Sequence, residues 1–149
     1  MTTGSADALS KAFDMLLDEG DALLCESPTF SGSLAYLQPI GCKLVGVECD
    51  AGGLDPSALE GILRGWDAEA EGRPRPRVLY VTPTGANPSG ASLDASRRRR
   101  IYEIARQFEL LILEDDPYHW LQFAAERTKS LVSGSGMEGP GGIGPGCRA

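Results

Sequence analysis

The sequence is poor in the side chains that build metal centres. It has one histidine, His119, and four cysteines, none of which forms a Cys-x-x-Cys pair. Zinc centres use several cysteine and histidine ligands at short spacings, so we expect no metal site. In a chain without a visible signal sequence, the cysteines are best interpreted as free thiols in a reducing compartment.

Long apolar runs and excess positive charge are also missing. No segment approaches the roughly 18 consecutive apolar residues that a membrane-spanning helix needs. With 14 Lys and Arg against 21 Asp and Glu, the formal net charge is −7, which is unsuited to neutralising a run of phosphates. We therefore expect neither a membrane nor a nucleic acid as a partner. The first five residues lack the charged and apolar regions of a signal peptide, which favours the cytoplasm or the mitochondrial matrix.

The composition that remains is that of a globular protein. Hydrophobic residues make up 42% of the chain and charged residues 23%, enough apolar mass for one core. Of the sixteen residues from 134 to 149, seven are glycine, and this segment has no apolar periodicity. We interpret residues 1–125 as the folded part and residues 126–149 as a disordered tail.

Within the folded part, apolar periodicity and breaker residues predict alternating helices and strands. The predicted helices span residues 6–17, 31–37, 55–64 and 94–108, and the predicted strands span residues 21–25, 43–48, 77–82 and 110–114. Ser5, Asp55 and Asp94 are suited to the starts of helices, and the run of bases at 97–100 suggests a solvated helix face. Strands that are apolar throughout indicate a three-layer α/β fold with a mainly parallel sheet.

Three polar loops are expected to meet at one edge of this sheet, because ligands of such folds bind beyond the carboxyl ends of the strands. Residues 3–6 precede the first helix, and Gly4 and Ser5 there offer backbone freedom and a hydroxyl. Unpaired N–H groups at a helix N-terminus suit a phosphate. The alternative for this loop is an ordinary helix cap.

The other two loops follow the third and fourth strands and carry amide and carboxylate side chains. Asn87 is both a donor and an acceptor, so it could bind a phenolate oxygen or instead cap its own turn. Asp115 could pair with a protonated ring nitrogen, and Tyr118 could reach the same ring. The alternative for these acids is a capping cluster where the strand ends.

In this order, the segments resemble the central part of the class I/II, fold-type I pyridoxal-phosphate aminotransferases, and most of all their kynurenine/α-aminoadipate branch. The resemblance depends on Thr-Gly-Ser (3–5), Glu-Ser-Pro-Thr-Phe-Ser-Gly (26–32), Asn-Pro-Ser-Gly (87–90) and Leu-Ile-Leu-Glu-Asp-Asp-Pro-Tyr (111–118). It covers about residues 2–125, so residues 1–125 would form part of the large, cofactor-binding domain.

The resemblance implies a set of cofactor-binding residues: Ser5, Ala6, Phe30, Asn87, Asp115 and Tyr118. Ser5 and the backbone amide of Ala6 would bind the phosphate of pyridoxal 5'-phosphate, and Phe30 would stack on its pyridine ring. The family branch often has a hydrogen-bonding side chain at position 6 and a tyrosine at position 30. Here Ala6 offers its backbone alone, and Phe30 keeps the stacking surface without the hydroxyl.

The remaining implied roles concern the polar atoms of the ring. Asn87 and Tyr118 would bind the phenolic oxygen, and Asp115 would keep the pyridine nitrogen protonated. A protonated ring is the stronger electron sink when the substrate loses its α-proton. A carboxylate beside the nitrogen favours the charged ring.

The resemblance also implies a Schiff-base lysine, and none stands in the required setting. The three lysines are Lys11, Lys43 and Lys129, so we assign no catalytic residue to this chain and expect it to be inactive alone. A whole family member would transfer an amino group from an amino acid such as kynurenine or 2-aminoadipate to a 2-oxo acid such as 2-oxoglutarate, as a homodimer. The alternatives are a noncatalytic truncated product that associates with a full-length subunit, and another fold-type I lyase or a regulator domain.

Overall fold

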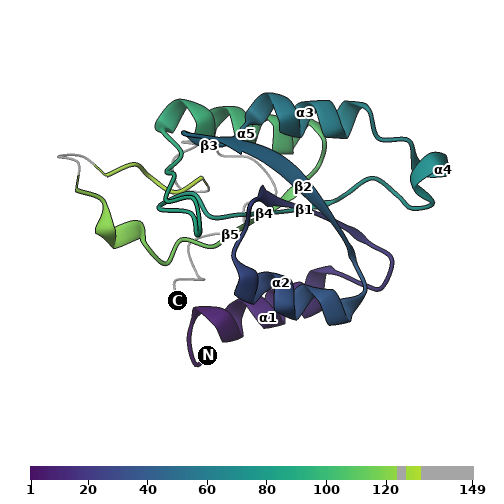
Figure 1. Cartoon of the computed structure of the whole chain (residues 1–149), viewed down its shortest axis with the longest axis horizontal. Coiled ribbons are helices and arrows are strands. Elements are labelled where there is room, and N and C mark those ends of the chain that lie inside the picture. Colours follow the sequence, from purple (N-terminus) through teal and green to yellow (C-terminus); the bar gives the residue numbers. More distant parts are fainter. Residues whose placement is uncertain (124–126, 132–149) are drawn as a thin grey trace.

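The computed structural model describes residues 1–123 and 127–131 (Figure 1). Its elements, in chain order, are α1 (Ser5–Leu16), β1 (Ala22–Ser27), α2 (Ser31–Ile40), β2 (Lys43–Asp50), β3 (Gly53–Leu54), α3 (Pro56–Arg64), α4 (Ala68–Glu71), β4 (Val78–Val81), α5 (Ala95–Gln107), β5 (Leu111–Glu114) and the 3-10 helix η1 (His119–Leu121). In this part of the chain, no helix has the length and apolar character needed to cross a bilayer.

The described strands form one sheet in the order β3-β2-β1-β4-β5. The pairs β1–β2, β1–β4 and β4–β5 are parallel, and the two-residue strand β3 runs antiparallel to its neighbour. Helices α3 and α5 lie on one face of the sheet and α1 and α2 on the other (Figure 1). The predicted three-layer α/β fold with a mainly parallel sheet is confirmed.

The sheet separates two apolar cores. The core under α3 and α5 contains Leu24, Val47, Leu54, Leu59, Leu63, Leu79, Val81, Leu93, Ile101, Ile104 and Leu131. The core under α1 and α2 contains Phe13, Leu17, Leu23, Cys25, Leu37, Val78 and Tyr80. Successive residues of β1 and β4 enter opposite cores, because side chains alternate across a strand. Both faces of these strands are buried, as their continuous apolar sequences predict.

Two of the three predicted helix caps are confirmed. The Asp55 carboxylate accepts a hydrogen bond from Ser57 N, and that of Asp94 accepts one from Arg97 N. Ser5 is not a cap: it is the first residue of α1, and Gly4 holds the cap position. Gly4 has a φ of +154°, a backbone conformation that residues with side chains rarely adopt. A glycine is therefore favoured at the turn into α1.

Three local features differ from the predictions. Helix α2 continues through Pro39 to Ile40 and ends at Gly41, whose φ of 77° is left-handed. The polar segment before β4 contains a short helix, α4, capped by Asp67. Strand β3 was not predicted, because two residues carry no periodicity.

The chain remains packed beyond the predicted domain boundary at 125. Leu131 is buried in the core under α3 and α5, and its backbone N donates to Glu114 Oε1 at 3.2 Å. The Gln122 side chain accepts from Thr128 N at 2.9 Å. The structure therefore places residues 127–131 against the body of the domain, whereas the rest of the predicted tail, 126 and 132–149, lies outside the described residues.

Strand β5 forms one edge of the sheet. The sequence predicts it to be apolar on both faces, yet Leu111 is 39% exposed and the following residues to Glu114 are half-buried. Among the described strands its only partner is β4. A strand with an interior-type sequence thus occupies an edge position.

Candidate functional site

A hollow of about 480 Å³ opens at the carboxyl ends of the strands, where the sequence predicts a ligand site. Its walls come from α1, α2 and the segments after β1, β4 and β5. The lining residues are Ser5, Ala6, Leu9, Ser10, Phe13, Phe30, Gly32, Ser33, Tyr36, Thr82, Asn87, Asp115, Pro117 and Tyr118. All six residues that the resemblance selected are among them. Their individual roles toward a cofactor stay predictions.

The N-terminus of α1 forms one wall. Ser5 and Ala6 lie in its first turn, where backbone N–H groups have no partner within the helix. Thr3 N donates to Asp7 Oδ2 at 2.9 Å, and Lys11 Nζ donates to the same oxygen at 2.7 Å. These contacts hold the loop before α1 against the helix without using Ser5.

The aromatic wall follows β1. Phe30 precedes α2, is 41% exposed and lines the hollow, so part of its ring is open to it. A Cβ atom at Gly32 would lie 2.4 Å from Phe30 Cε1, which no real contact tolerates. The glycine two residues downstream is therefore needed for the ring to lie where it does.

The loop after β4 carries Asn87 to the rim. The Asn87–Pro88 peptide bond is cis, and Ala86 N donates to Ala91 O at 2.8 Å across the loop. Gly85 has a φ of +57°, and a Cβ there would lie 3.6 Å from the Tyr118 ring. Asn87 and Tyr118 thus approach the hollow from two loops in close contact.

Arg98 anchors this loop, and it corrects the prediction of a solvated face at 97–100. It is 4% exposed, and its guanidinium donates to Leu93 O at 2.9 Å and to Pro83 O and Thr84 Oγ1 at 3.0 Å. A fourth bond reaches Lys129 O at 3.0 Å. The prediction was wrong here because Pro83, Thr84 and Lys129, which supply three of the four acceptors, belong to other segments of the chain.

Asp115 is the only charged side chain among the described residues that line this hollow. It directly follows β5, and its backbone N donates to Val81 O at 3.0 Å. Burial raises the pKa of its carboxyl, Asp116 raises it further, and a hydrogen bond from Tyr80 opposes both. A cation in the hollow would favour the ionised carboxylate, because an opposite charge offsets the cost of desolvation.

Sequence reasoning missed two buried polar side chains beneath the hollow. Tyr80 Oη lies 2.9 Å from Ser33 Oγ and donates to Asp115 Oδ2 at 3.0 Å. Glu26 Oε2 accepts from Thr82 N at 2.9 Å, and burial raises the pKa of Glu26 to about 7. Each is a polar side chain next to the apolar residues of its strand, which was the available signal.

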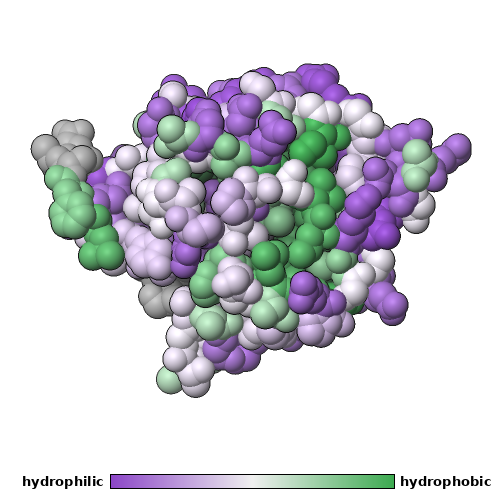
Figure 2. Space-filling model, in the orientation of Figure 1, coloured by the Kyte–Doolittle hydropathy of each residue, from purple (hydrophilic) through white to green (hydrophobic). Residues whose placement is uncertain are grey.

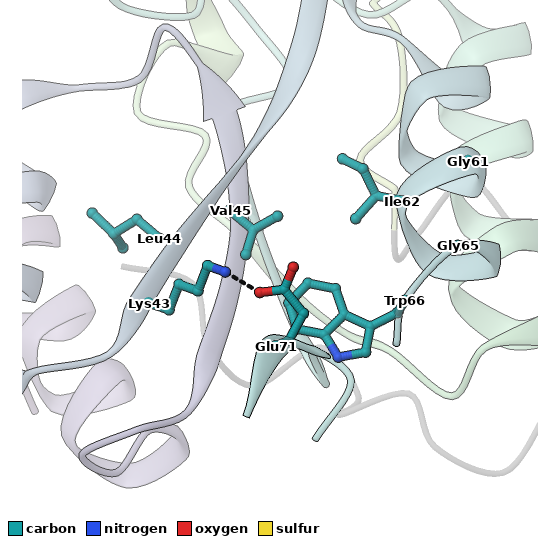
Figure 3. Close-up of a pocket in the computed structure, with 8 residues that line it drawn as sticks. All are labelled: Lys43, Leu44, Val45, Gly61, Ile62, Gly65, Trp66 and Glu71. Atoms are coloured by element: carbon teal, nitrogen blue, oxygen red, sulfur yellow. Dashed lines mark hydrogen bonds and ion pairs between the residues drawn. The ribbon is translucent and has the colours of Figure 1, made fainter. Parts of the chain in front are cut away.

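A second hollow, of about 530 Å³, lies beside the start of β2 (Figure 3). Lys43 binds Glu71 there, and its Nζ lies 5.7 Å from the centroid of the Trp66 ring. Half-buried Val45 and Ile62 line it (Figure 3). Figure 2 shows an apolar band on the surface between α3 and α2. None of the six predicted residues lines it.

Within residues 1–123 and 127–131, no lysine lines the hollow at the carboxyl ends of the strands. Lys11 is paired with Asp7 on the outside of α1, and Lys43 begins β2, at the opposite end of the strand. Lys129 is exposed. That none of the three stands in the family's catalytic position stays a prediction.

Comparison with known proteins identifies relatives along most of the chain. Residues 1–137 match the family "Aminotransferase class I and II". The chain is 44% identical over 126 residues to the mitochondrial kynurenine/alpha-aminoadipate aminotransferase of Bos taurus, covering 83% of the chain and 30% of that relative. It is 43% identical over 137 residues to an L-tyrosine:2-oxoglutarate aminotransferase of Serpula lacrymans, covering 92% of the chain and 26% of that relative.

Solved structures agree. The kynurenine aminotransferase of Pyrococcus horikoshii superposes with a TM-score of 0.79 at 28% identity, over 87% of this chain and 31% of that one. The alpha-aminoadipate aminotransferase of Thermus thermophilus, complexed with N-(5'-phosphopyridoxyl)-L-leucine, gives a TM-score of 0.78 at 34% identity, over 87% and 31%. The chain thus spans about a third of the length of these structures. By sequence and by fold, it belongs to the class I and II aminotransferases, a family that uses pyridoxal phosphate.

Proposed function

We propose that the hollow at the carboxyl ends of the strands is a binding site for pyridoxal 5'-phosphate. The observation that carries the proposal is that six residues from four separate segments, each selected by a sequence motif, line one space. Residues that are up to 113 positions apart in the sequence, as Ser5 and Tyr118 are, would not be expected to line one space by chance.

The chemistry of the lining fits this cofactor group by group. The first turn of α1 offers N–H groups to a phosphate, and Phe30 offers a flat apolar surface to a ring. Asn87 and Tyr118 offer hydrogen bonds to an oxygen on the rim, and Asp115 offers a carboxylate to a protonated nitrogen. Bound there, the cofactor supplies an electron sink for breaking the bond to the substrate α-proton.

The lining also limits how tightly the cofactor is held. Among the described residues that line the hollow there is no lysine or arginine, so neutral groups alone meet the phosphate. We therefore expect reversible, noncovalent binding. Asp115 contributes through the ring nitrogen, where burial strengthens its attraction to a positive charge.

For the whole protein, we infer transfer of an amino group from a kynurenine-like or 2-aminoadipate-like amino acid to a 2-oxo acid such as 2-oxoglutarate. The names of the Bos taurus and Thermus thermophilus relatives support this substrate class. We further infer a homodimer in the mitochondrial matrix or the cytoplasm.

Titration of the purified chain with pyridoxal 5'-phosphate, followed by cofactor absorbance, tests the site. We expect saturable binding, and Asp115→Asn should weaken it about 30-fold, since a hydrogen bond to a charged group contributes about 2 kcal/mol. Glu71→Gln, in the second hollow, is the matched control and should bind like the original chain. Equal binding by all three proteins would overturn the site, and borohydride reduction should label no lysine.

A second candidate is a noncatalytic chain that associates with a full-length subunit. The half-exposed apolar edge at β5 favours it, because such an edge is a template for a further strand. Co-expression with a tagged full-length relative, followed by size-exclusion chromatography, tests it. Co-elution that an Ile112→Lys substitution abolishes would support association through this edge, and separate elution would contradict it.

A further inference from the structure

Three polar side chains are hydrogen-bonded in series at the hollow: Ser33 and Asp115 line it, and Tyr80 lies between them. Ser33 Oγ lies 2.9 Å from Tyr80 Oη, which lies 3.0 Å from Asp115 Oδ2. The three residues belong to α2, β4 and the end of β5, and are 47 and 35 positions apart along the sequence. Ser33 is 5% exposed and Tyr80 0%, so water does not substitute for these partners.

The direction of both hydrogen bonds follows from the number of protons. A tyrosine hydroxyl has one proton, and an ionised carboxylate only accepts. Tyr80 therefore donates to Asp115, and Ser33 must donate to Tyr80. Burial raises the pKa of Tyr80 to about 12, so the hydroxyl keeps its proton throughout the neutral range.

We propose that Tyr80 is a positioning residue that fixes the Asp115 carboxylate for the ring nitrogen, with Ser33 orienting the Tyr80 hydroxyl. The proposal rests on the cofactor site proposed above. A carboxylate has two oxygens, so the bond that Oδ2 accepts from Tyr80 does not compete with a bond that Oδ1 accepts from a positive group in the hollow. The bond selects one orientation of a side chain that would otherwise rotate.

The ring of Tyr80 is well suited to this role because its position is fixed independently of its hydroxyl. Its ring packs edge-on against Phe13, with centroids 5.5 Å apart and an interplanar angle of 76°. Its strand pairs on both sides, with β1 and β5. Tyr80→Phe therefore removes one hydrogen bond while keeping the packing, which separates a positioning role from a structural one.

The first test needs no cofactor. The pKa of Asp115 is measured by NMR of its 13C-labelled carboxyl carbon, in the original chain, Tyr80→Phe and Ser33→Ala. The Tyr80 bond lowers this pKa, so Tyr80→Phe should raise it further above its ordinary value. Ser33→Ala should shift it in the same direction by less. An unchanged pKa in both variants would overturn the proposal.

The second test measures affinity for pyridoxal 5'-phosphate. Tyr80→Phe should weaken binding roughly tenfold and Ser33→Ala roughly threefold, in line with loss of one hydrogen bond to a charged group and of its supporting partner. Tyr102→Phe, which removes a hydroxyl from α5, is the control and should bind unchanged. If Tyr80→Phe does not fold, the result for Ser33→Ala is used in both tests: an unchanged Asp115 pKa and an unchanged affinity would overturn the proposal.

The two tests separate this inference from the proposed function. Suppose that the pKa of Asp115 rises in Tyr80→Phe but that no variant binds the cofactor. The hydrogen bonds from Ser33 to Tyr80 and from Tyr80 to Asp115 would then be supported, and the cofactor site would be overturned. Cofactor binding that Asp115→Asn weakens but Tyr80→Phe leaves unchanged would keep the site and overturn the positioning role.

Discussion

The two hollows of this domain are similar in size and differ in how they are built. The one beside β2 has a volume of about 530 Å³ and the one at the carboxyl ends about 480 Å³. Its charged groups, Lys43 and Glu71, neutralise one another. The hollow at the carboxyl ends instead presents Asp115, whose carboxylate accepts from a neutral donor, Tyr80, and meets no cationic side chain among the described lining residues.

The unbalanced charge of Asp115, and not the volume, therefore distinguishes the two hollows. A paired lysine and glutamate at a half-exposed surface need nothing further from a ligand. A half-buried carboxylate among neutral groups is costly unless a positive group joins it. Four substitutions test this contrast between the hollows and the packing of the strands and loops around them.

The largest effect is expected from Arg98→Met, which removes the anchor of the Asn87 loop. It leaves two buried carbonyl oxygens, a part-buried one and a buried hydroxyl without their donor, so we expect the free energy of unfolding to fall by about 4 kcal/mol. Urea denaturation measures it. Arg99→Met, at the exposed neighbouring position, should change stability by less than about 0.5 kcal/mol. Equal effects would show that Arg98 anchors nothing.

Glu26 should make the stability of the chain depend on pH. Its pKa rises from an ordinary 4.5 to about 7 in the folded state, so the folded state holds this proton more tightly than the unfolded state. Its contribution is complete below about pH 4.5, is lost as the pH rises to about 7, and amounts to on the order of 3 kcal/mol. Denaturation of Glu26→Gln across this range should lack that decline, and parallel curves would contradict the assignment.

Asn87→Ala should weaken binding of pyridoxal 5'-phosphate about fivefold, which is the loss of roughly 1 kcal/mol for one neutral hydrogen bond. Titration followed by cofactor absorbance measures it. Because Asn87 is exposed on the loop, stability should not change. A stability loss equal to the binding loss would assign Asn87 to the turn and not to the ligand.

The smallest effect is expected from Lys43→Ala in the second hollow. Its side chain is 40% exposed and that of Glu71 is 34% exposed, so the ion pair contributes at most about 1 kcal/mol. Cofactor affinity should be unchanged. A change in affinity larger than the one caused by Asn87→Ala would reverse the comparison between the two hollows.

Local signals in the sequence predicted much of this architecture. Asp55 and Asp94 cap their helices because the capping bond reaches two or three residues along the chain. Ser5 is also a residue type that favours the cap position, yet Gly4 occupies that position. The positive φ at this turn suits glycine, and no side chain caps the helix. Caps are thus predictable where no special backbone conformation competes.

Contacts between distant segments were not predictable in the same way. Arg98 has the same neighbours in sequence as Arg99, and only its register on α5 places it against the carbonyls of the loop after β4. The hydrogen bonds that connect Ser33, Tyr80 and Asp115 likewise form only when three segments are brought together. The motifs identified the residues that line the hollow, and the packing beneath them required the structure.

The central position of β1 has a consequence for slow motions. It is hydrogen-bonded on both sides, to β2 and β4, and Leu23 and Leu24 are 0% exposed. The amide hydrogens of these residues should be the last to exchange with deuterium, because their release requires global unfolding. The first turn of α1 needs only local fraying. The rim of the hollow can therefore open on a much faster timescale than the strands that support it.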